Sequence, residues 1–127
     1  MRALILSTAS LLLFIGIWGI FYHYSDDVLQ GMISSCQNDV MPAIQQENWN
    51  TASQSITQQY QAWHEYQQKA LYMLEADSLN KTEEGFAKTL MYIQAEDLSN
   101  SSGELLALQK QLSYLHQRES ITLKNIL

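Results

Sequence analysis

The hydrophobic pattern begins with an unbroken apolar stretch near the N-terminus. Residues 3–22 carry no charged side chain. As a helix they extend about 30 Å, which is the thickness of the hydrocarbon core of a bilayer. A cleavable signal peptide has a shorter apolar region, of about 7–15 residues, followed by small residues at the cleavage site. Here the stretch ends in Phe21, Tyr22, His23 and Tyr24. We therefore expect a retained membrane anchor, and a cleaved signal is the alternative.

The residues that flank the apolar stretch predict how it sits in a membrane. Trp18, Tyr22 and Tyr24 are typical of the aromatic belt at a membrane–water interface. Arg2 is the only basic residue near either end of the stretch, and basic residues favour the cytoplasmic side. We expect a single-pass cell-membrane protein that contacts the lipid bilayer through residues 3–22, with a cytoplasmic N-terminus and an extracytoplasmic C-terminal part.

Beyond the anchor, apolar residues recur at intervals of three and four, which is the spacing of one helix face. Ser25 is placed as an N-cap, with Asp26 and Asp27 in the first turn, where acidic residues stabilise a helix. The stripe that follows consists of Leu29, Ile33, Cys36, Val40 and Ile44. Pro42 is expected to kink or interrupt this helix, because proline lacks the backbone N–H.

A polar turn at residues 45–48 leads into a second predicted helix, over residues 49–74. The residues placed mostly on its apolar face are Trp49, Ala52, Ile56, Tyr60, Trp63, Ala70, Leu71 and Leu74. A break is expected at residues 77–81, followed by a third helix in which Glu83 and Glu84 favour the N-terminal end. The apolar stripe of the third helix is Phe86, Leu90 and Ile93.

The fourth predicted helix opens at Ser101 and Glu104, a capping-box pattern in which the two side chains satisfy free backbone N–H groups. Its apolar stripe is Leu105, Leu108, Leu112 and Leu115. The fold class is therefore all-α, with an N-terminal transmembrane helix followed by a small antiparallel bundle of three to four helices. Residues 1–24 form the cytoplasmic N-terminus and the anchor, and residues 25–127 form the extracytoplasmic bundle.

Charge excludes one class of partner. Without the first 25 residues the chain has 6 Lys and Arg against 13 Asp and Glu, a net charge of −7. A nucleic-acid-binding surface needs basic residues that displace counterions from phosphates, so no nucleic acid is expected as a partner. Cys36 is the one cysteine, which excludes an internal disulfide, and its place on the apolar stripe indicates simple packing.

No pattern of residues predicts chemistry. His23, His64 and His116 have no cysteine or second histidine at the spacing of metal ligands. Position 68, where a metalloprotease motif beginning at His64 needs its second histidine, is Gln68. We expect no catalytic residue, no metal site, no cofactor and no enzymatic activity.

Two groups of residues are candidates for contact with another molecule. Tyr66 and Tyr72 fall off the main stripe of the second helix, and exposed tyrosine is typical of protein interfaces; rings lying flat on the edge of the bundle are the alternative. The C-terminal residues 121–127 contain four large aliphatic side chains, of which Leu123, Ile126 and Leu127 are the candidate contacts. These side chains need cover, either from the bundle itself or from a partner.

The chain resembles a family of small bacterial membrane proteins known as domain of unknown function 4363. The resemblance covers nearly the whole chain. It rests on the anchor, on the turn before Trp49 and Ala52, on Trp63, and above all on the terminal residues 119–127, ESITLKNIL. It implies a single-pass protein with an extracytoplasmic helical domain and no assigned activity.

These features together favour a membrane-anchored extracytoplasmic interaction module, an accessory subunit that binds another membrane protein or a second copy of itself. An extracytoplasmic bundle that senses a small ligand is the alternative, and it requires a cleft with converging polar groups. An enzyme is the least favoured class, since no nucleophile and base are paired in the sequence.

Overall fold

The computed structural model describes residues 1–71 and 74–126, with side chains described as far as Arg118. These residues are helical and include no strand. The helices are α1 (Arg2–Ser35), α2 (Met41–Gln45), α3 (Trp49–Ala70), α4 (Ala76–Gln94) and α5 (Leu98–Ile126), and the π-helical segment η1 (Cys36–Val40) joins α1 to α2. The predicted all-α fold, an apolar N-terminal helix followed by an antiparallel bundle, is confirmed.

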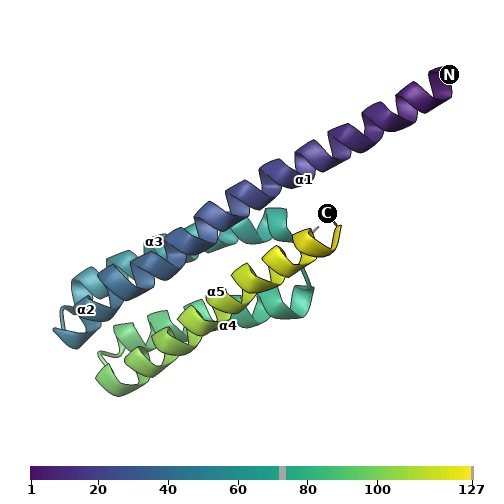
Figure 1. Ribbon diagram of the computed structural model, residues 1–127. Coiled ribbons are helices and arrows are strands. Elements are labelled where there is room, and N and C mark those ends of the chain that lie inside the picture. Colours follow the sequence, from purple (N-terminus) through teal and green to yellow (C-terminus); the bar gives the residue numbers. More distant parts are fainter. Residues whose placement is uncertain (72–73, 127) are drawn as a thin grey trace.

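Helix α1 forms both an apolar rod, which is its exposed first half, and one side of the bundle. Its first half projects from the molecule, and its second half is one side of the bundle (Figure 1). The predicted helix start at Ser25 is wrong, because α1 passes through this residue without a break. Ser25 is fully buried, and its Oγ lies 2.5 Å from the Tyr66 hydroxyl oxygen. Ser25 is therefore not a helix cap, and it makes a polar contact between α1 and α3.

The interruption expected from Pro42 is present. In η1, just before Pro42, the Met41 N–H donates to the Cys36 carbonyl, five residues back. A π-helical turn of this kind accommodates a local defect in the α-helical hydrogen-bond ladder. Proline creates such a defect because it has no N–H to donate. Both Cys36 and Val40 stay buried through this segment, so the apolar stripe continues into α2.

The two tight turns at one end of the bundle have the same construction. Glu47 and Glu96 both have a φ of 55°, in the left-handed region. Glu47 N–H donates to the Ile44 carbonyl at 2.9 Å and Asn48 N–H to the Ala43 carbonyl at 2.8 Å, a Schellman arrangement that ends α2. The same pair of bonds surrounds Glu96. Each glutamate is followed by the residue that caps the next helix.

Those caps correct two predicted helix starts. Asp97 Oδ1 accepts from the Asn100 N–H at 3.1 Å, so α5 begins at Leu98. Ser101 is consequently inside α5, fully buried, and the predicted capping box with Glu104 is wrong. At the start of α3, Asn48 Oδ1 accepts from Thr51 N–H at 3.4 Å, as the polar turn at residues 45–48 suggested.

The predicted break at residues 77–81 is also misplaced. Helix α4 already begins at Ala76, so Glu83 and Glu84 lie in its middle and not at its N-terminal end. The second predicted helix, over residues 49–74, ends earlier, at Ala70. The apolar residues just beyond Ala70 had extended the helical pattern in the sequence past the point where the backbone turns.

The core lies between four long helical segments. Helix α1 packs against α3 and α5, and α4 packs against the same two helices on the far side, so α1 and α4 lie diagonally opposite. The centre is aromatic, with the Trp63 and Phe86 ring centroids 5.9 Å apart and those of Trp63 and Tyr66 5.5 Å apart. All three side chains are fully buried, which ties α3 to α4.

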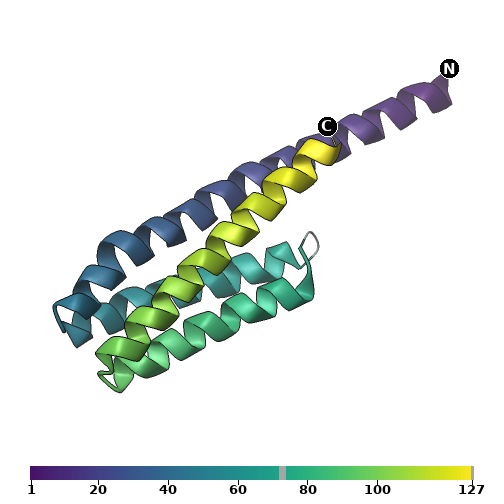
Figure 2. The same cartoon turned by 60° about the horizontal axis from the view of Figure 1, so that its bottom comes forward.

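The bundle has two distinct ends (Figures 1 and 2). The proximal end is the one from which the rod of α1 projects, and there α3 ends, α4 begins and α5 ends. The distal end carries the α2–α3 and α4–α5 turns. This division places the N-terminal rod and the last turns of α5 on the same side of the molecule.

Candidate interaction site

The residues predicted to lie at a membrane interface are found where α1 enters the bundle. Trp18, Tyr22 and Tyr24 are all half-buried. The Tyr24 ring stacks on Tyr66 at a centroid distance of 6.4 Å, and the Lys69 ammonium lies 4.6 Å from the Tyr24 ring centre. The Tyr24 ring therefore packs against α3 of the bundle.

Tyr66 is not a surface residue, and its predicted exposure is wrong. Its side chain is fully buried between α1 and α3, where it contacts Ser25, Tyr24 and Trp63. The physical reason is that α3 is flanked by both α1 and α4. A helix with two neighbours buries a wider face than a single apolar stripe suggests. Tyr66 thus stabilises the bundle and is unavailable to a partner.

The other predicted contact residues lie wholly or partly outside the part of the chain that the structure describes. Tyr72 and Leu127 lie outside the residues that the structure describes. The backbone of α5 includes Leu123 and Ile126, although the side chains beyond Arg118 are outside the described part. The structure therefore places these two residues at the proximal end of the bundle (Figure 2) and does not test their contacts.

A belt of polar contacts crosses the bundle next to its proximal end. His116 of α5 pairs with Asp26 of α1. Arg118 Nη2 of α5 donates to Glu75 Oε1 at the start of α4, at 2.6 Å. With the contact between Ser25 and Tyr66, these pairs link all four long helices at one level. We call these six residues, together with Tyr24 and Lys69, the polar belt.

The outer face of α5 differs from the outer face of α3. Its exposed residues, at the helical spacing of three and four, are Gly103, Leu106, Ala107, Lys110 and Tyr114, here called the α5 face. Leu106 is 48% exposed and Tyr114 is 46% exposed. The corresponding exposed residues in the middle of α3 are polar: Gln54, Thr57, Gln58, Gln61, His64, Glu65 and Gln68. Large apolar groups on the α5 face are thus not a general property of this surface.

Sequence reasoning missed the α5 face. A detectable signal was present, because Gly103, Ala107, Lys110 and Tyr114 follow the spacing i, i+4, i+7, i+11. This is the spacing of one helix face. The neighbouring stripe of leucines gives a stronger hydrophobic signal, because its residues form the core.

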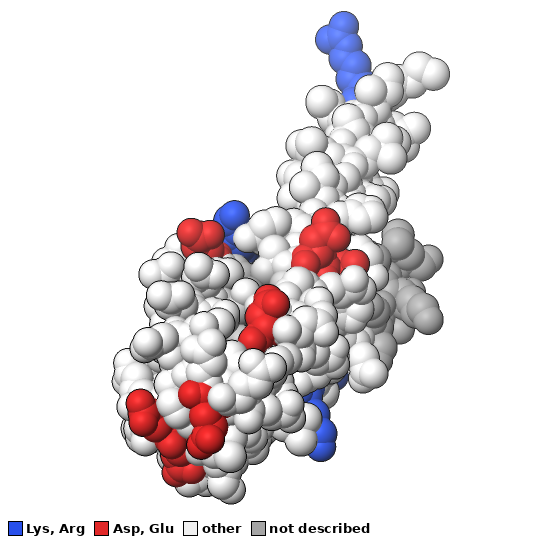
Figure 3. Space-filling model, turned by 90° about the vertical axis from the view of Figure 1, so that its left-hand side faces the viewer, with Lys and Arg blue, Asp and Glu red and all other residues white. Residues whose placement is uncertain are grey.

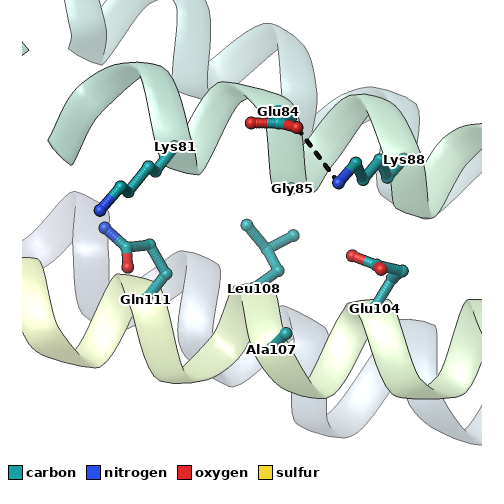
Figure 4. Close-up of a pocket in the computed structure, with 8 residues that line it drawn as sticks. All are labelled: Lys81, Glu84, Gly85, Lys88, Glu104, Ala107, Leu108 and Gln111. Carbon is teal, nitrogen blue, oxygen red and sulfur yellow. Dashed lines mark ion pairs between the residues drawn. The ribbon is translucent and has the colours of Figure 1, made fainter. Parts of the chain in front are cut away.

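A shallow groove of about 200 Å³ borders the α5 face, between α4 and α5. Figure 4 shows Gly85, Ala107 and Leu108 in its floor and charged side chains along its rim. Gly85 lies close to α5, since a Cβ at this position would lie 3.1 Å from Leu108 Cδ1, a tight contact that the leucine side chain would have to relieve. Small residues thus bring α4 and α5 close together and leave a hollow on the surface.

The charges at the groove are largely matched to each other. Lys88 Nζ lies 3.1 Å from Glu84 Oε1 (Figure 4). The hydrogen bond and the charge of Glu84, with Glu104 nearby, raise the pKa of Lys88. Lys81 and Gln111 complete the rim. A groove with paired charges and an apolar floor can receive a side chain or a helix, and its groups do not converge on one reacting atom.

The groups that could carry out chemistry are either buried or apart. Cys36 is fully buried, and burial raises the pKa of its thiol to about 12, so it is protonated at neutral pH and not nucleophilic. His64 lies 3.8 Å from Glu83 on the surface of the bundle, and His116 belongs to the polar belt. Within residues 1–71 and 74–126, no three His, Cys, Asp or Glu side chains are grouped as metal ligands.

The fold defines the class to which this protein belongs. Among the described residues one helix, the N-terminal one, is long and apolar enough to cross a membrane, judged by length and composition. The class is a helical bundle built onto a long apolar N-terminal helix. Residues 20–126 match the family described as domain of unknown function (DUF4363), and the chain belongs to this family. Comparisons with curated proteins and with solved structures gave no match.

Proposed function

We propose that the chain is a membrane-anchored interaction module, an accessory subunit that binds another membrane protein through its extracytoplasmic bundle. The apolar half of α1 is the anchor. Arg2 and the N-terminal amine lie on the cytoplasmic side, since basic groups favour that side of a membrane. The bundle then lies on the opposite side of the membrane, where a single buried cysteine requires no disulfide partner.

The α5 face is the observation that carries this proposal. Leu106 and Tyr114 are large and half-exposed, and tyrosine is enriched at protein interfaces. Between them Gly103 and Ala107 are small and open, with no atom within 4 Å of a Cβ built at Gly103. Small residues four positions apart let the backbone of a second helix approach closely. The α5 face therefore suits a helix of a partner protein.

The continuity of α1 supports the same function. The helix that would cross the membrane is also the first helix of the bundle, with no loop between them. The contacts of Ser25 with Tyr66 and of Asp26 with His116 then lock the rod to α3 and α5. A rigid connection holds the α5 face at a fixed height and orientation above the membrane, which favours binding to a neighbour in the same membrane.

The proposal includes no catalytic step. It is supported by the buried, protonated thiol of Cys36 and by the pairing of Lys88 with Glu84 at the α4–α5 groove. Neither arrangement provides a nucleophile next to a base.

Co-purification with matched variants tests the proposal. The full-length protein, tagged at the N-terminus, is extracted from native membranes in mild detergent, and bound proteins are quantified by mass spectrometry. We expect one membrane protein in near-equal amount. Ala107→Glu should abolish its recovery, because the longer charged side chain blocks the small site on the α5 face. Gln58→Glu on the outer face of α3 adds the same charge at an exposed site, and it should leave recovery unchanged.

The outcomes separate the possible partners. Recovery of a second tagged copy in place of another protein would assign the α5 face to self-association. If the protein is recovered alone, or if Ala107→Glu retains the partner as well as Gln58→Glu does, the α5 face is not the binding surface. Equal melting temperatures of the two variants would establish that the loss is not due to unfolding.

A small-ligand sensor is the second candidate, and the α4–α5 groove is the observation that favours it. Lys81, Lys88 and Glu104 on its rim could bind a small zwitterionic molecule. Such a ligand would raise the melting temperature in proportion to its occupancy of the folded state. A screen of small polar molecules that gives no such rise, in the wild type and in a Lys88→Gln variant alike, would remove this candidate.

A further inference from the structure

The free part of α1 is shorter than a membrane. Residues 1–17 are exposed, and from Trp18, whose indole Nε1 is fully enclosed, one side of α1 is covered while Ile20 on another side stays 73% exposed. Counted from Ala3 to Ile17, the free apolar helix extends about 22 Å, against about 30 Å for the hydrocarbon core. The missing length is about 8 Å. It corresponds to the part of α1 from Trp18 to Tyr22, which already lies beside the bundle.

The last turns of α5 lie at the level of this missing length. Helices α1 and α5 run antiparallel, and His116 pairs with Asp26. Ten residues further along α5, Ile126 lies about 15 Å beyond His116. The same step back along α1 from Asp26 reaches Gly16, inside the apolar stretch. Figure 2 shows the end of α5 next to this part of α1.

The end of α3 reaches a similar level. Tyr66 contacts Ser25, and the antiparallel course of α3 places Leu71 about as far toward the N-terminus of α1 as residue 20. Leu71 is 55% exposed, although it is a large apolar side chain. The sequence of the last turns of α5 includes three large aliphatic residues, Ile121, Leu123 and Ile126, among polar ones. Leu71 and the end of α5 therefore lie at the level of residues 18–22 of α1, which is the length that the free helix lacks to span the hydrocarbon core.

The charged groups of the polar belt begin just beyond this level. Asp26 lies four residues past Tyr22, or about 6 Å further along α1, and Lys69 contacts Tyr24. Paired charges such as these require water or polar headgroups nearby. The molecule thus changes from apolar to charged within a short distance, as the boundary between acyl chains and headgroups does.

The opposite end of the bundle has the reverse character. Its turns contain Glu47, Glu96 and Asp97, and Figure 3 shows acidic side chains at the end away from the rod as well as nearer its base. Acidic groups are repelled by anionic headgroups. The distal turns, which carry these carboxylates, are therefore the less suited of the two ends to contact with a membrane surface.

We propose that the proximal end of the bundle, formed by Leu71 and the last turns of α5, enters the headgroup–acyl boundary of the bilayer that α1 spans. This inference rests on the proposed anchoring by α1. An insertion of about 8 Å agrees with the depth of about 5–10 Å at which amphipathic helices lie in membranes.

The length of the free apolar helix favours the bilayer, in place of a partner protein, as the occupant of this end. If the proximal end stayed in water, the bilayer would have to thin by about 8 Å around a single helix, at a cost that rises with each ångström of mismatch. Burial of the same apolar groups in lipid is favourable by about 25 cal/mol for each Å². The occupant is the lipid that already surrounds α1.

Depth-dependent quenching tests the proposal. Single-cysteine variants of the full-length chain, made in a Cys36→Ala background, carry an environment-sensitive fluorophore in phosphatidylcholine vesicles. The label is placed at Leu71→Cys or Leu123→Cys, with Leu106→Cys as the matched control on α5 and Leu12→Cys in the anchor. Lipids with a nitroxide near the headgroup serve as shallow quenchers, and lipids with one near the acyl-chain end as deep quenchers.

We expect shallow quenchers to reduce the fluorescence at positions 71 and 123 and leave position 106 unaffected, while deep quenchers reduce it at position 12. If position 12 is quenched and positions 71 and 123 behave like position 106, the insertion is refuted and the anchoring stands. If position 12 is not quenched, the anchoring itself fails and the insertion falls with it. The two reporters lie on different helices, so a local disturbance by one label does not decide the result.

Discussion

The contact between Ser25 and Tyr66 gives a quantitative test of the connection between the rod and the bundle. Both side chains are fully buried, and their oxygens are 2.5 Å apart. A buried hydrogen bond contributes about 1 kcal/mol, and a hydroxyl left without its partner costs about 1–3 kcal/mol. Tyr66→Phe and Ser25→Ala should therefore each lower the stability of the bundle by about 1–2 kcal/mol.

The double variant distinguishes this bond from simple packing. Once either hydroxyl is gone, removal of the other no longer breaks a bond between them, so the two effects should fall short of additivity by about 1 kcal/mol. The assay is thermal unfolding of the full-length protein in detergent, followed by circular dichroism. Each kcal/mol corresponds to a shift of about 5 °C for a bundle of this size. Additive effects, within about 0.5 kcal/mol, would refute a shared hydrogen bond.

Further predictions concern the backbone and the buried thiol. Glu47→Gly and Glu96→Gly should each raise the stability by about 1 kcal/mol in denaturant titrations, since glycine adopts the observed φ of 55° without steric cost. Gly31→Ala should stabilise α1 by about 1 kcal/mol, because its Cβ meets no atom within 4 Å. Gly85→Leu should instead destabilise the bundle, since even a Cβ there meets α5 at 3.1 Å. Burial raises the pKa of Cys36 from 9.0 to about 12, so only the unfolded thiol ionises between these values. Stability should fall as the pH rises above about 9, by up to ~1.4 kcal/mol for each pH unit. Cys36→Ala should show a smaller fall over the same range, and an identical fall in both proteins would contradict the raised pKa.

The local signals that were predicted correctly depend on the nature of single residues or on regular spacing. The defect before Pro42 follows from the missing N–H of proline, and it appears as the π-helical segment η1. The leucine stripe of α5 is buried as its spacing indicates, with Leu105, Leu112 and Leu115 fully enclosed. Cys36 is buried for the same reason. Such features require no knowledge of the neighbouring helices.

Errors arose where one residue type has two common roles. Ser25 and Ser101 both looked like caps because serine favours that position, but both are buried inside helices. The true caps, Asn48 and Asp97, follow left-handed glutamates. Glutamate carries no signal for that conformation, so the turn around Glu96 was missed, whereas the turn at residues 45–48 was predicted from its run of polar residues.

The sequence by itself determined that the chain is helical, that one apolar segment is long enough to cross a membrane, and which residues form the helix stripes. These properties follow from local periodicity and composition. Only the tertiary structure decided that Tyr66 is buried while the α5 face is exposed, because burial of a helix face depends on how many neighbours the helix has. It also decided that the rod continues into the bundle, and that the ends of α3 and α5 both lie at the proximal end. Such relations between distant residues depend on the packing of all four long helices, which no single segment of sequence specifies.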